Sequence, residues 1–249
     1  MQDKKDIESY KLINKHFEKL NKKAGARTLK MHIDRENKDK INLKRISRIK
    51  RKFGMITKIR KKTKLRTGMK EMLESNVCKN ILNQSFKTSK PRQVFSTDVT
   101  YLTNSKGQRA YLSGVKDLCT REIVGFEVSR NNDIDLVIGS LRNITDLKSE
   151  SEEIIIHSDQ GHQYISHVYQ NYLRSKKVTQ SMSRRGNCYD NAPIESFFGH
   201  MKDECDYKDW TNINELKRKI RSYMSFYNEK RPQWSLKRKT PVEYRSFLS

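Results

Sequence analysis

The sequence predicts an α/β protein in which a mixed five-stranded sheet follows a basic helical module and precedes a helical extension. Two observations carry this prediction. Residues 1–92 hold 29 Lys and Arg against 9 Asp and Glu, a net charge of +20, whereas residues 93–249 have a net charge of only +4. Apolar residues recur at helical spacing in the first part, and β-branched or aromatic runs alternate with helical patterns in the second. The expected regions are a helical module at 1–66, a linker at 67–91, a core at 92–205 and a helical extension at 206–249.

Three short helices are expected in the first region. The apolar stripe of the first consists of Ile7, Tyr10, Ile13, Phe17 and Leu20. The second covers 27–36, with Leu29 and Ile33 facing inward. The third covers 42–53, with Asn42 as its N-cap and Gly54 at the position expected for a left-handed C-cap. The outer face of this third helix is basic and presents Lys44, Arg45, Arg48, Lys50, Arg51 and Lys52.

Three short helices that end in a basic one are typical of a helix-turn-helix module, with 42–53 as the recognition helix. A solvated basic face on an ordinary helical hairpin would show the same pattern. The basic block at 58–66 favours DNA, because such a run repels itself unless phosphates neutralise it. The formal charge of +24 on the whole chain also makes a nucleic acid the first partner to consider.

Cysteine spacing and hydropathy indicate the compartment. The four cysteines are widely spaced and form no C-x-x-C pair, which argues against a disulfide framework or a structural zinc knuckle. No run approaches 18 apolar residues, and the N-terminus has no apolar signal-peptide stretch. A soluble, cytoplasmic and nucleoid-associated protein without a membrane partner is therefore expected.

From residue 93 the pattern is that of an α/β core. Strands are expected at 94–102, 109–116, 122–129, 153–157 and 178–182, and helices at 133–147, 164–174 and 192–202. Three meandering strands followed by alternating helix and strand predict a mixed sheet covered on both faces, an order found in RNase H-like cores. A further amphipathic helix is expected at 212–228, and Trp234 with the segment 241–247 is expected to tie down the C-terminus.

Three acidic residues stand out by position. Asp98 lies in the middle of the first strand, where a charge is costly unless it is neutralised. Asp159 follows the apolar strand at 153–157, at the carboxyl end where α/β sheets place ligands. Glu195 lies in the opening turns of the helix at 192–202, which Asp190 or Asn191 can cap and Pro193 can help start. Taken singly, each acid is more often a solvated surface group, but 35 residues separate Asp159 from Glu195, and that spacing is informative.

The spacing and three strings carry a resemblance to a known family. The D, D(35)E arrangement resembles the signature of DDE transposases and retroviral integrases. H-S-D-Q-G-H-Q-Y at 157–164, S-M-S-R-R-G-N-C-Y-D-N-A-P-I-E-S-F-F-G-H-M-K-D-E at 181–204 and Y-N-E-K-R-P-Q-W-S-L-K-R-K-T-P-V-E-Y at 227–244 resemble the second-frame, OrfB-type transposases of the IS-three insertion-sequence family. The N-terminal helices are similar to the helix-turn-helix segment of that family.

The resemblance implies an RNase H-like, integrase-type core that cleaves and joins DNA at insertion-sequence ends. It assigns the two aspartates and the glutamate of the motif to Asp98, Asp159 and Glu195, as catalytic residues and ligands of two Mg²⁺ or Mn²⁺ ions. The basic residue seven places after the glutamate, which touches the DNA end, falls on Lys202. Gln160 is a departure, because the family often has arginine there.

The partner expected on these grounds is double-stranded DNA, both as transposon ends and as target, bound by a homo-oligomer. The residues expected to contact DNA are Lys202, Lys44, Arg45, Arg48, Arg51, Lys52, Arg184 and Arg185.

Other interpretations remain open. His157, His162 and His167 recur at five-residue steps, which matches no zinc spacing, and His157 is interpreted as a strand-end residue. Asp117 is interpreted as structural or turn-forming. The chain could instead be a non-catalytic DNA-binding regulator or a domesticated remnant, and a simple RNase H-like nuclease acting on RNA–DNA hybrids is a third class.

Overall fold

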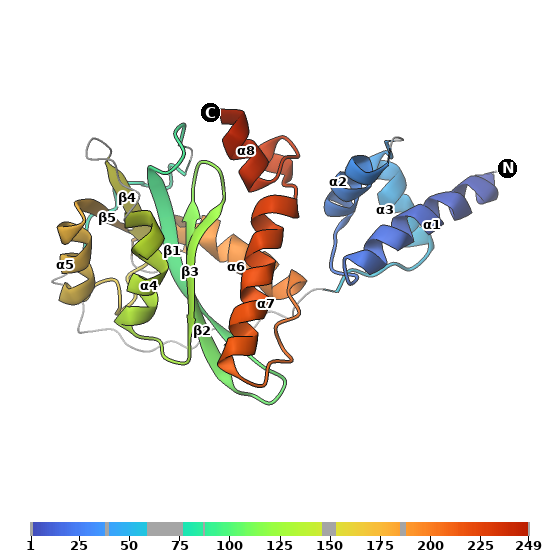
Figure 1. The fold of residues 1–249 in the computed structure, drawn as a ribbon. Coiled ribbons are helices and arrows are strands. Elements are labelled where there is room, and N and C mark those ends of the chain that lie inside the picture. Colours follow the sequence, from blue (N-terminus) through green and yellow to red (C-terminus); the bar gives the residue numbers. More distant parts are fainter. Residues whose placement is uncertain are drawn as a thin grey trace.

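The structure, a computed structural model, describes residues 2–37, 40–58, 77–86, 88–145, 153–184 and 188–248. A five-stranded sheet in the order β3-β2-β1-β4-β5 forms the centre of the larger part (Figure 1). Its strands are β1 (Val94–Thr103), β2 (Arg109–Asp117), β3 (Ile123–Ser129), β4 (Ile154–Ser158) and β5 (Val178–Met182). The first three form an antiparallel meander, and β4 and β5 continue it in parallel from β1. The predicted mixed sheet is confirmed, with its strands near the expected positions.

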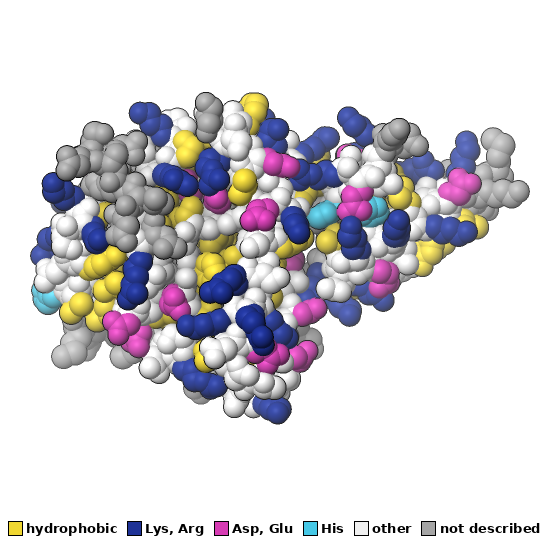
Figure 2. All heavy atoms as spheres, viewed as in Figure 1, with side chains coloured by type: hydrophobic (Ala, Val, Ile, Leu, Met, Phe, Trp, Pro, Cys, Tyr) yellow, Lys and Arg dark blue, Asp and Glu magenta, His cyan; other side chains and the backbone are white. Residues whose placement is uncertain are grey.

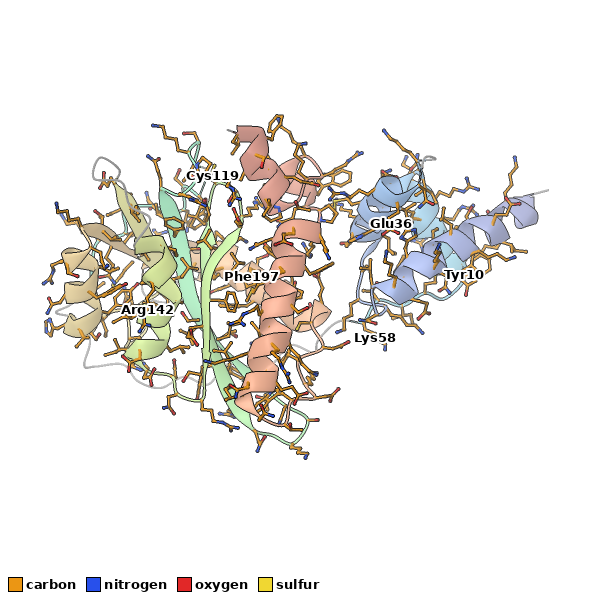
Figure 3. All side chains as sticks on the ribbon, in the orientation of Figure 1. Tyr10, Glu36, Lys58, Cys119, Arg142 and Phe197 are labelled. Atoms are coloured by element: carbon orange, nitrogen blue, oxygen red, sulfur yellow. The ribbon has the colours of Figure 1, made fainter. Side chains whose placement is uncertain are left out.

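Each face of the sheet has its own hydrophobic core. On one face α4 (Ile134–Thr145) and α5 (His167–Ser175) pack over apolar residues such as Phe95 and Ile156. On the other face α6 (Ala192–Glu204) and α7 (Ile213–Ser225) cover Leu112 and Val128. Phe197 of α6, labelled in Figure 3, lies in this second core with its ring edge-on to Tyr227 at 4.8 Å between centroids. The prediction of a sheet covered on both faces is confirmed.

Some helix boundaries differ from those expected. α5 begins at His167 because the Ser166 side chain accepts a hydrogen bond from the Tyr169 amide, so Tyr164 lies in the turn before the helix. α7 ends at Ser225 and continues as a π-helical turn, Phe226–Lys230. A 3-10 turn (Trp234–Leu236) and α8 (Pro241–Leu248) complete the chain. Trp234 is 45% exposed, and the guanidinium groups of Arg27 and Arg238 lie 6.0 and 4.9 Å from its ring centre.

The N-terminal part consists of α1 (Gln2–Lys19), α2 (Ala26–Glu36) and α3 (Leu43–Lys52), which enclose a separate small core. The Asn42 side chain caps α3 by accepting a hydrogen bond from the Lys44 amide at 2.8 Å, as predicted. Gly54 has a φ of +61°, the left-handed conformation predicted for it after α3. Leu29 and Ile33 are fully buried as expected, but Ile7 is 47% exposed.

The exposure of Ile7 has a structural reason. α1 has 18 residues against 10 in α3, and its first turns project past the other two helices (Figure 1). At this level the side of α1 that meets α3 carries Asp6, which is 1% exposed. The contact between the two helices is therefore ionic at this end, where a continuous apolar stripe was expected.

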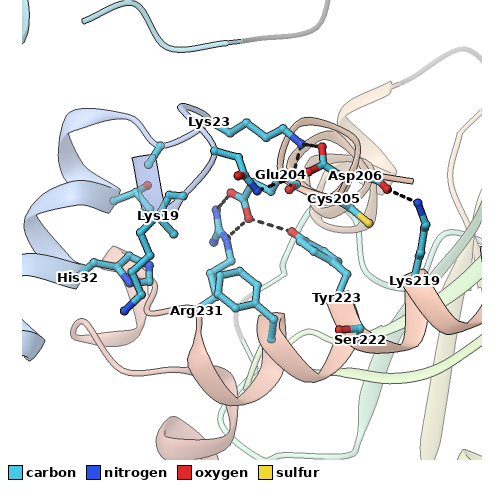
Figure 4. A pocket seen from close by; sticks show the side chains of 15 residues that line it. Lys19, Lys23, His32, Glu204, Cys205, Asp206, Lys219, Ser222, Tyr223 and Arg231 are labelled. Atoms are coloured by element: carbon cyan, nitrogen blue, oxygen red, sulfur yellow. Dashed lines mark hydrogen bonds and ion pairs between the residues drawn. The ribbon is translucent and has the colours of Figure 1, made fainter. Parts of the chain in front are cut away.

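The three-helix module rests on the C-terminal part of the chain through ion pairs. Lys23 lies 2.6 Å from Asp206, Arg35 pairs with Glu243, and Asp34 lies 4.0 Å from Arg238. A cavity of about 470 Å³ separates the two surfaces, and Figure 4 shows the charged side chains that line it. Figure 2 shows Lys and Arg side chains spread over the module and over α7, with acidic groups between them. In the described residues no helix is long and apolar enough to cross a membrane.

Candidate active site

Asp98 lies in the middle of β1, at the face that α6 covers. It pairs with Gly114 of β2, and residues directly opposite each other in antiparallel strands point to the same face. At Gly114 a Cβ atom would meet the Phe198 ring at 3.2 Å, so the absence of a side chain lets α6 lie close to the strands. Asp98 is half-buried, and its Oδ1 accepts a hydrogen bond from the Val99 amide at 2.7 Å.

Asp159 follows β4 directly, at the carboxyl end of that strand. The parallel register pairs Ser96 with His157, so two residues further along Asp98 and Asp159 come to neighbouring positions. Asp159 Oδ1 accepts a hydrogen bond from the Gly161 amide at 2.8 Å. A Cβ atom at Gly161 would lie 2.9 Å from the same oxygen. A side chain at this position would displace the oxygen, so glycine leaves room for the carboxylate in this turn.

Glu195 lies in the first turn of α6 and is exposed. Pro193 stands in the same turn, as predicted. Asn191, one of the two predicted caps, is the N-cap residue of α6, but its side chain accepts no capping hydrogen bond. Both side chains form other hydrogen bonds. Asn191 donates to the Thr97 carbonyl, and Asp190 accepts from a cluster of donors described below.

The Asp159 charge acts on both of the other acids. Burial and the neighbouring Asp159 charge, with a smaller contribution from Glu195, raise the pKa of Asp98. Burial also raises the pKa of Asp159, and burial with the Asp159 charge raises the pKa of Glu195. The predicted acids thus lie on two neighbouring strands and one helix, near enough for the Asp159 charge to act on the other two. In the part of the chain that the structure describes, no three His, Cys, Asp or Glu side chains are close enough to form a ligand set for a metal ion.

Lys202 lies in the last turn of α6, beside β1. Its Nζ donates a hydrogen bond to Thr100 Oγ1 and lies 4.7 Å from the centre of the Tyr101 ring. Its positive charge acts to lower the pKa of Asp98. The ammonium group is therefore within electrostatic reach of Asp98.

The basic residues predicted to contact DNA differ in their surroundings. Arg48 and Lys52 donate hydrogen bonds to the buried Asp6 carboxylate at 2.5–2.9 Å. Arg45 donates to the Lys5 carbonyl at 3.2 Å. Lys44 and Arg51 are exposed. Arg184 is bound to Asp190, and Arg185 lies outside the described residues.

Two other interpretations from the sequence can be compared with the structure. Asp117 is 1% exposed and accepts hydrogen bonds from the Cys119 and Thr120 amides, which confirms a turn-forming role. His157 is fully buried at the end of β4, with Nδ1 2.8 Å from Ser181 Oγ.

Asp190, fully buried beside α6, is a residue that the sequence pattern did not single out, because Y-D-N-A-P suggests a helix cap.

This topology, a five-stranded sheet in the order β3-β2-β1-β4-β5 with helices on both faces, defines an RNase H-like core of the integrase type. Two solved retroviral structures share the fold. The integrase catalytic core domain of HTLV-2, solved in complex with magnesium, has a TM-score of 0.50 and 16% identity over 62% of this chain and 97% of its own. A chain of the simian T-cell lymphotropic virus intasome, solved with a PP2A regulatory subunit, has a TM-score of 0.51 and 15% identity over 70% of this chain and 60% of its own.

Sequence comparisons identify the family. Two families described as "Integrase core domain" match residues 88–188 and 176–241. The putative transposase InsK of the insertion sequence element IS150 from Escherichia coli is 35% identical over 95% of this chain and 82% of its own length. An uncharacterized transposase-like protein of Haemophilus influenzae is 36% identical over 83% of this chain and 94% of its own. The chain belongs to the OrfB-type transposases of the IS-three insertion-sequence family, polynucleotidyl transferases that act in DNA transposition.

Proposed function

We propose that Asp98, Asp159 and Glu195 are the catalytic carboxylates of this transposase and that they hold divalent cations, Mg²⁺ or Mn²⁺, during DNA cleavage and strand transfer. The observation that carries the proposal is that Asp98 and Asp159 lie at neighbouring positions of β1 and β4, and that the Asp159 charge raises the pKa of both Asp98 and Glu195. Like charges placed in this way are costly in isolation, and a cation that neutralises them would relieve that cost.

The donor set fits a hard divalent cation. All three side chains offer carboxylate oxygen, the ligand type that Mg²⁺ and Mn²⁺ prefer over thiolate or imidazole. Asp98 and Asp159 come from neighbouring strands whose register is fixed by backbone hydrogen bonds. Glu195 is exposed and keeps the rotamer freedom needed to join them. A bound pair of cations supplies activation of the attacking oxygen and neutralisation of the leaving one.

The residues of this chain have distinct tasks in that chemistry. The Val99 and Gly161 amides fix one oxygen each of Asp98 and Asp159, which leaves the other oxygens free to act as ligands. Lys202, held beside β1 by Thr100, provides a positive charge for a phosphate of the DNA end. With water as the attacking group the reaction is nicking, and with a 3′-hydroxyl it is strand transfer.

The remaining assignments concern partners and regions. We assign end recognition to the helical module at 1–66, with exposed Lys44 and Arg51 as phosphate contacts. We assign 67–91 to the linker, 92–205 to the catalytic core and 206–249 to the extension that carries the module. We further propose that a dimer or larger oligomer brings two DNA ends together in the cytoplasm, on the nucleoid.

The test is an in vitro joining assay with labelled duplexes that bear the flanking repeats of the element. Asp159→Asn should abolish nicking and joining in Mg²⁺ while end binding stays within about twofold, because the amide removes a charged ligand and little volume. The control is Asp209→Asn, the same change at an exposed aspartate in the loop before α7. Full strand transfer by the Asp159 variant would refute the assignment.

A further inference from the structure

Asp190 forms the centre of a polar cluster directly before α6. It lies in the 3-10 turn Cys188–Asn191 and is fully buried. Its carboxylate accepts hydrogen bonds from Asn80 at 3.0 Å, from Gln84 at 2.8 Å and from the backbone and side chain of Arg184 at 2.9–3.2 Å. The Arg184 guanidinium holds the pKa of Asp190 well below its usual range, so the carboxylate is charged at neutral pH.

Two of these donors come from residues 77–86, the described part of the segment that joins the helical module to the core. The same segment is also fastened to β5. The Met182 amide donates to the Lys79 carbonyl at 3.3 Å, and the Ile81 amide donates to Ser181 Oγ at 2.9 Å. The segment is therefore attached both to the sheet and to the turn that begins α6.

The turn that contains Asp190 is in contact with the strands that carry the acids. Asn191, 2% exposed, donates from Nδ2 to the Thr97 carbonyl at 3.3 Å, one residue before Asp98. The Lys116 ammonium of β2 donates to the Pro193 carbonyl at 2.8 Å. Glu195 follows two residues later. Polar bonds from β1 and from the segment 77–86 thus reach the 3-10 turn before α6, and a bond from β2 reaches the first turn of α6, which carries Glu195.

We propose that Asp190 is a positioning residue that ties residues 77–86 to the first turn of α6 and so sets Glu195 against Asp98 and Asp159. The inference rests on the proposed function of these three acids. It also connects residues 77–86, which precede the core in the chain, to the turn directly before the helix that carries Glu195.

The chemistry of the cluster requires a carboxylate. Asn80, Gln84 and Arg184 all donate, and a carboxylate accepts through both oxygens without offering a hydrogen. In Asp190→Asn one oxygen becomes an amide that faces donors, so one or more buried bonds are lost although the shape of the side chain is kept. This variant therefore removes the connection with little change in volume.

The first test measures Mn²⁺ affinity by titration calorimetry on the full chain. Asp190→Asn should weaken Mn²⁺ binding about tenfold, the usual effect of losing a group that orients a metal ligand. In the Glu195→Gln background the same substitution should have no further effect, because its action passes through Glu195. Equal losses in both backgrounds, or no loss in either, would overturn the proposal. Asp6→Asn is the matched control, a buried ion-paired aspartate in the other part of the molecule, and should leave Mn²⁺ affinity unchanged.

A second measurement separates this inference from the proposed function. Hydrogen exchange of the metal-free protein should become faster in Asp190→Asn at Ile81 and in the first turn of α6, with exchange in α3 unchanged. Unchanged protection at both places would contradict the positioning role. If the parent protein bound no Mn²⁺, the metal assignment would fail, and the exchange result would still decide whether Asp190 holds the turn.

Discussion

Two acids, one in each part of the molecule, have opposite electrostatic surroundings. In the helical module, Asp6 of α1 meets Arg48 and Lys52 of α3, and these bonds hold its pKa well below its usual range. In the core, Asp98 meets Asp159, and burial and that like charge raise its pKa. The first acid is matched by cations of its own chain, whereas the second faces other acids. The contrast separates an acid that joins two helices from an acid that needs an external cation.

The largest expected effect is at the acids that face each other. Asp98→Asn should abolish nicking and joining, because it removes a ligand and a charge from the site. In EDTA the same variant should unfold at a higher temperature than the parent, because like-charge repulsion is relieved. Thermal unfolding with and without Mg²⁺, beside the joining assay, checks both statements. A lower unfolding temperature in EDTA would mean that the carboxylate is matched by its surroundings, as Asp6 is.

The second prediction concerns how Asp6 and Asp98 change the stability of the protein with pH. Asp6 has a lowered folded pKa, so its contribution to stability is present above about pH 4, the unfolded value, and is lost as the pH falls through the lower folded value. Asp98 has a raised folded pKa, so its cost is absent below about pH 4, grows as the pH rises toward that raised value and is constant above it. Asp98 should therefore lower the stability of the metal-free core from acid toward alkaline pH, and Asp6 should raise the stability of the module.

Urea unfolding from pH 3 to 9 in EDTA measures these trends. Asp98→Asn should flatten the decline of the core, and Asp6→Asn should flatten the acid-side rise of the module. If the two variants shifted the same transition in the same direction, the distinction between the two buried acids would be lost.

The strands, the two cores and the acids could be predicted because each depends on local pattern. Asp98 lies within a β-branched run and Asp159 follows an apolar strand, so the sequence alone indicates that burying these charges is costly. The Asp6 and Asp190 clusters could not be predicted in this way. Asp6 lies 42 residues from Arg48, and Asp190 lies 106 residues from Gln84. Such pairings depend on how helices and segments pack in three dimensions, and a local pattern of charges does not reveal them.

The smallest expected effect distinguishes the basic residues of α3. Lys44→Ala should weaken end binding and reduce the slope of log affinity against log salt by about 1, because an exposed lysine releases one counterion per phosphate contact. Arg48→Ala should mainly lower the stability of the module, since its guanidinium is bound to Asp6. Fluorescence anisotropy at several salt concentrations, with thermal unfolding of both variants, measures the two effects. The same salt slope for Lys44→Ala and the parent would remove that residue from the DNA interface.

Anomalous diffraction from crystals grown with Mn²⁺ would locate the cation directly. We predict a strong peak bounded by the side chains of Asp98, Asp159 and Glu195, and its loss in Asp159→Asn. A peak at another place in the protein, or none there at saturating Mn²⁺, would contradict the account.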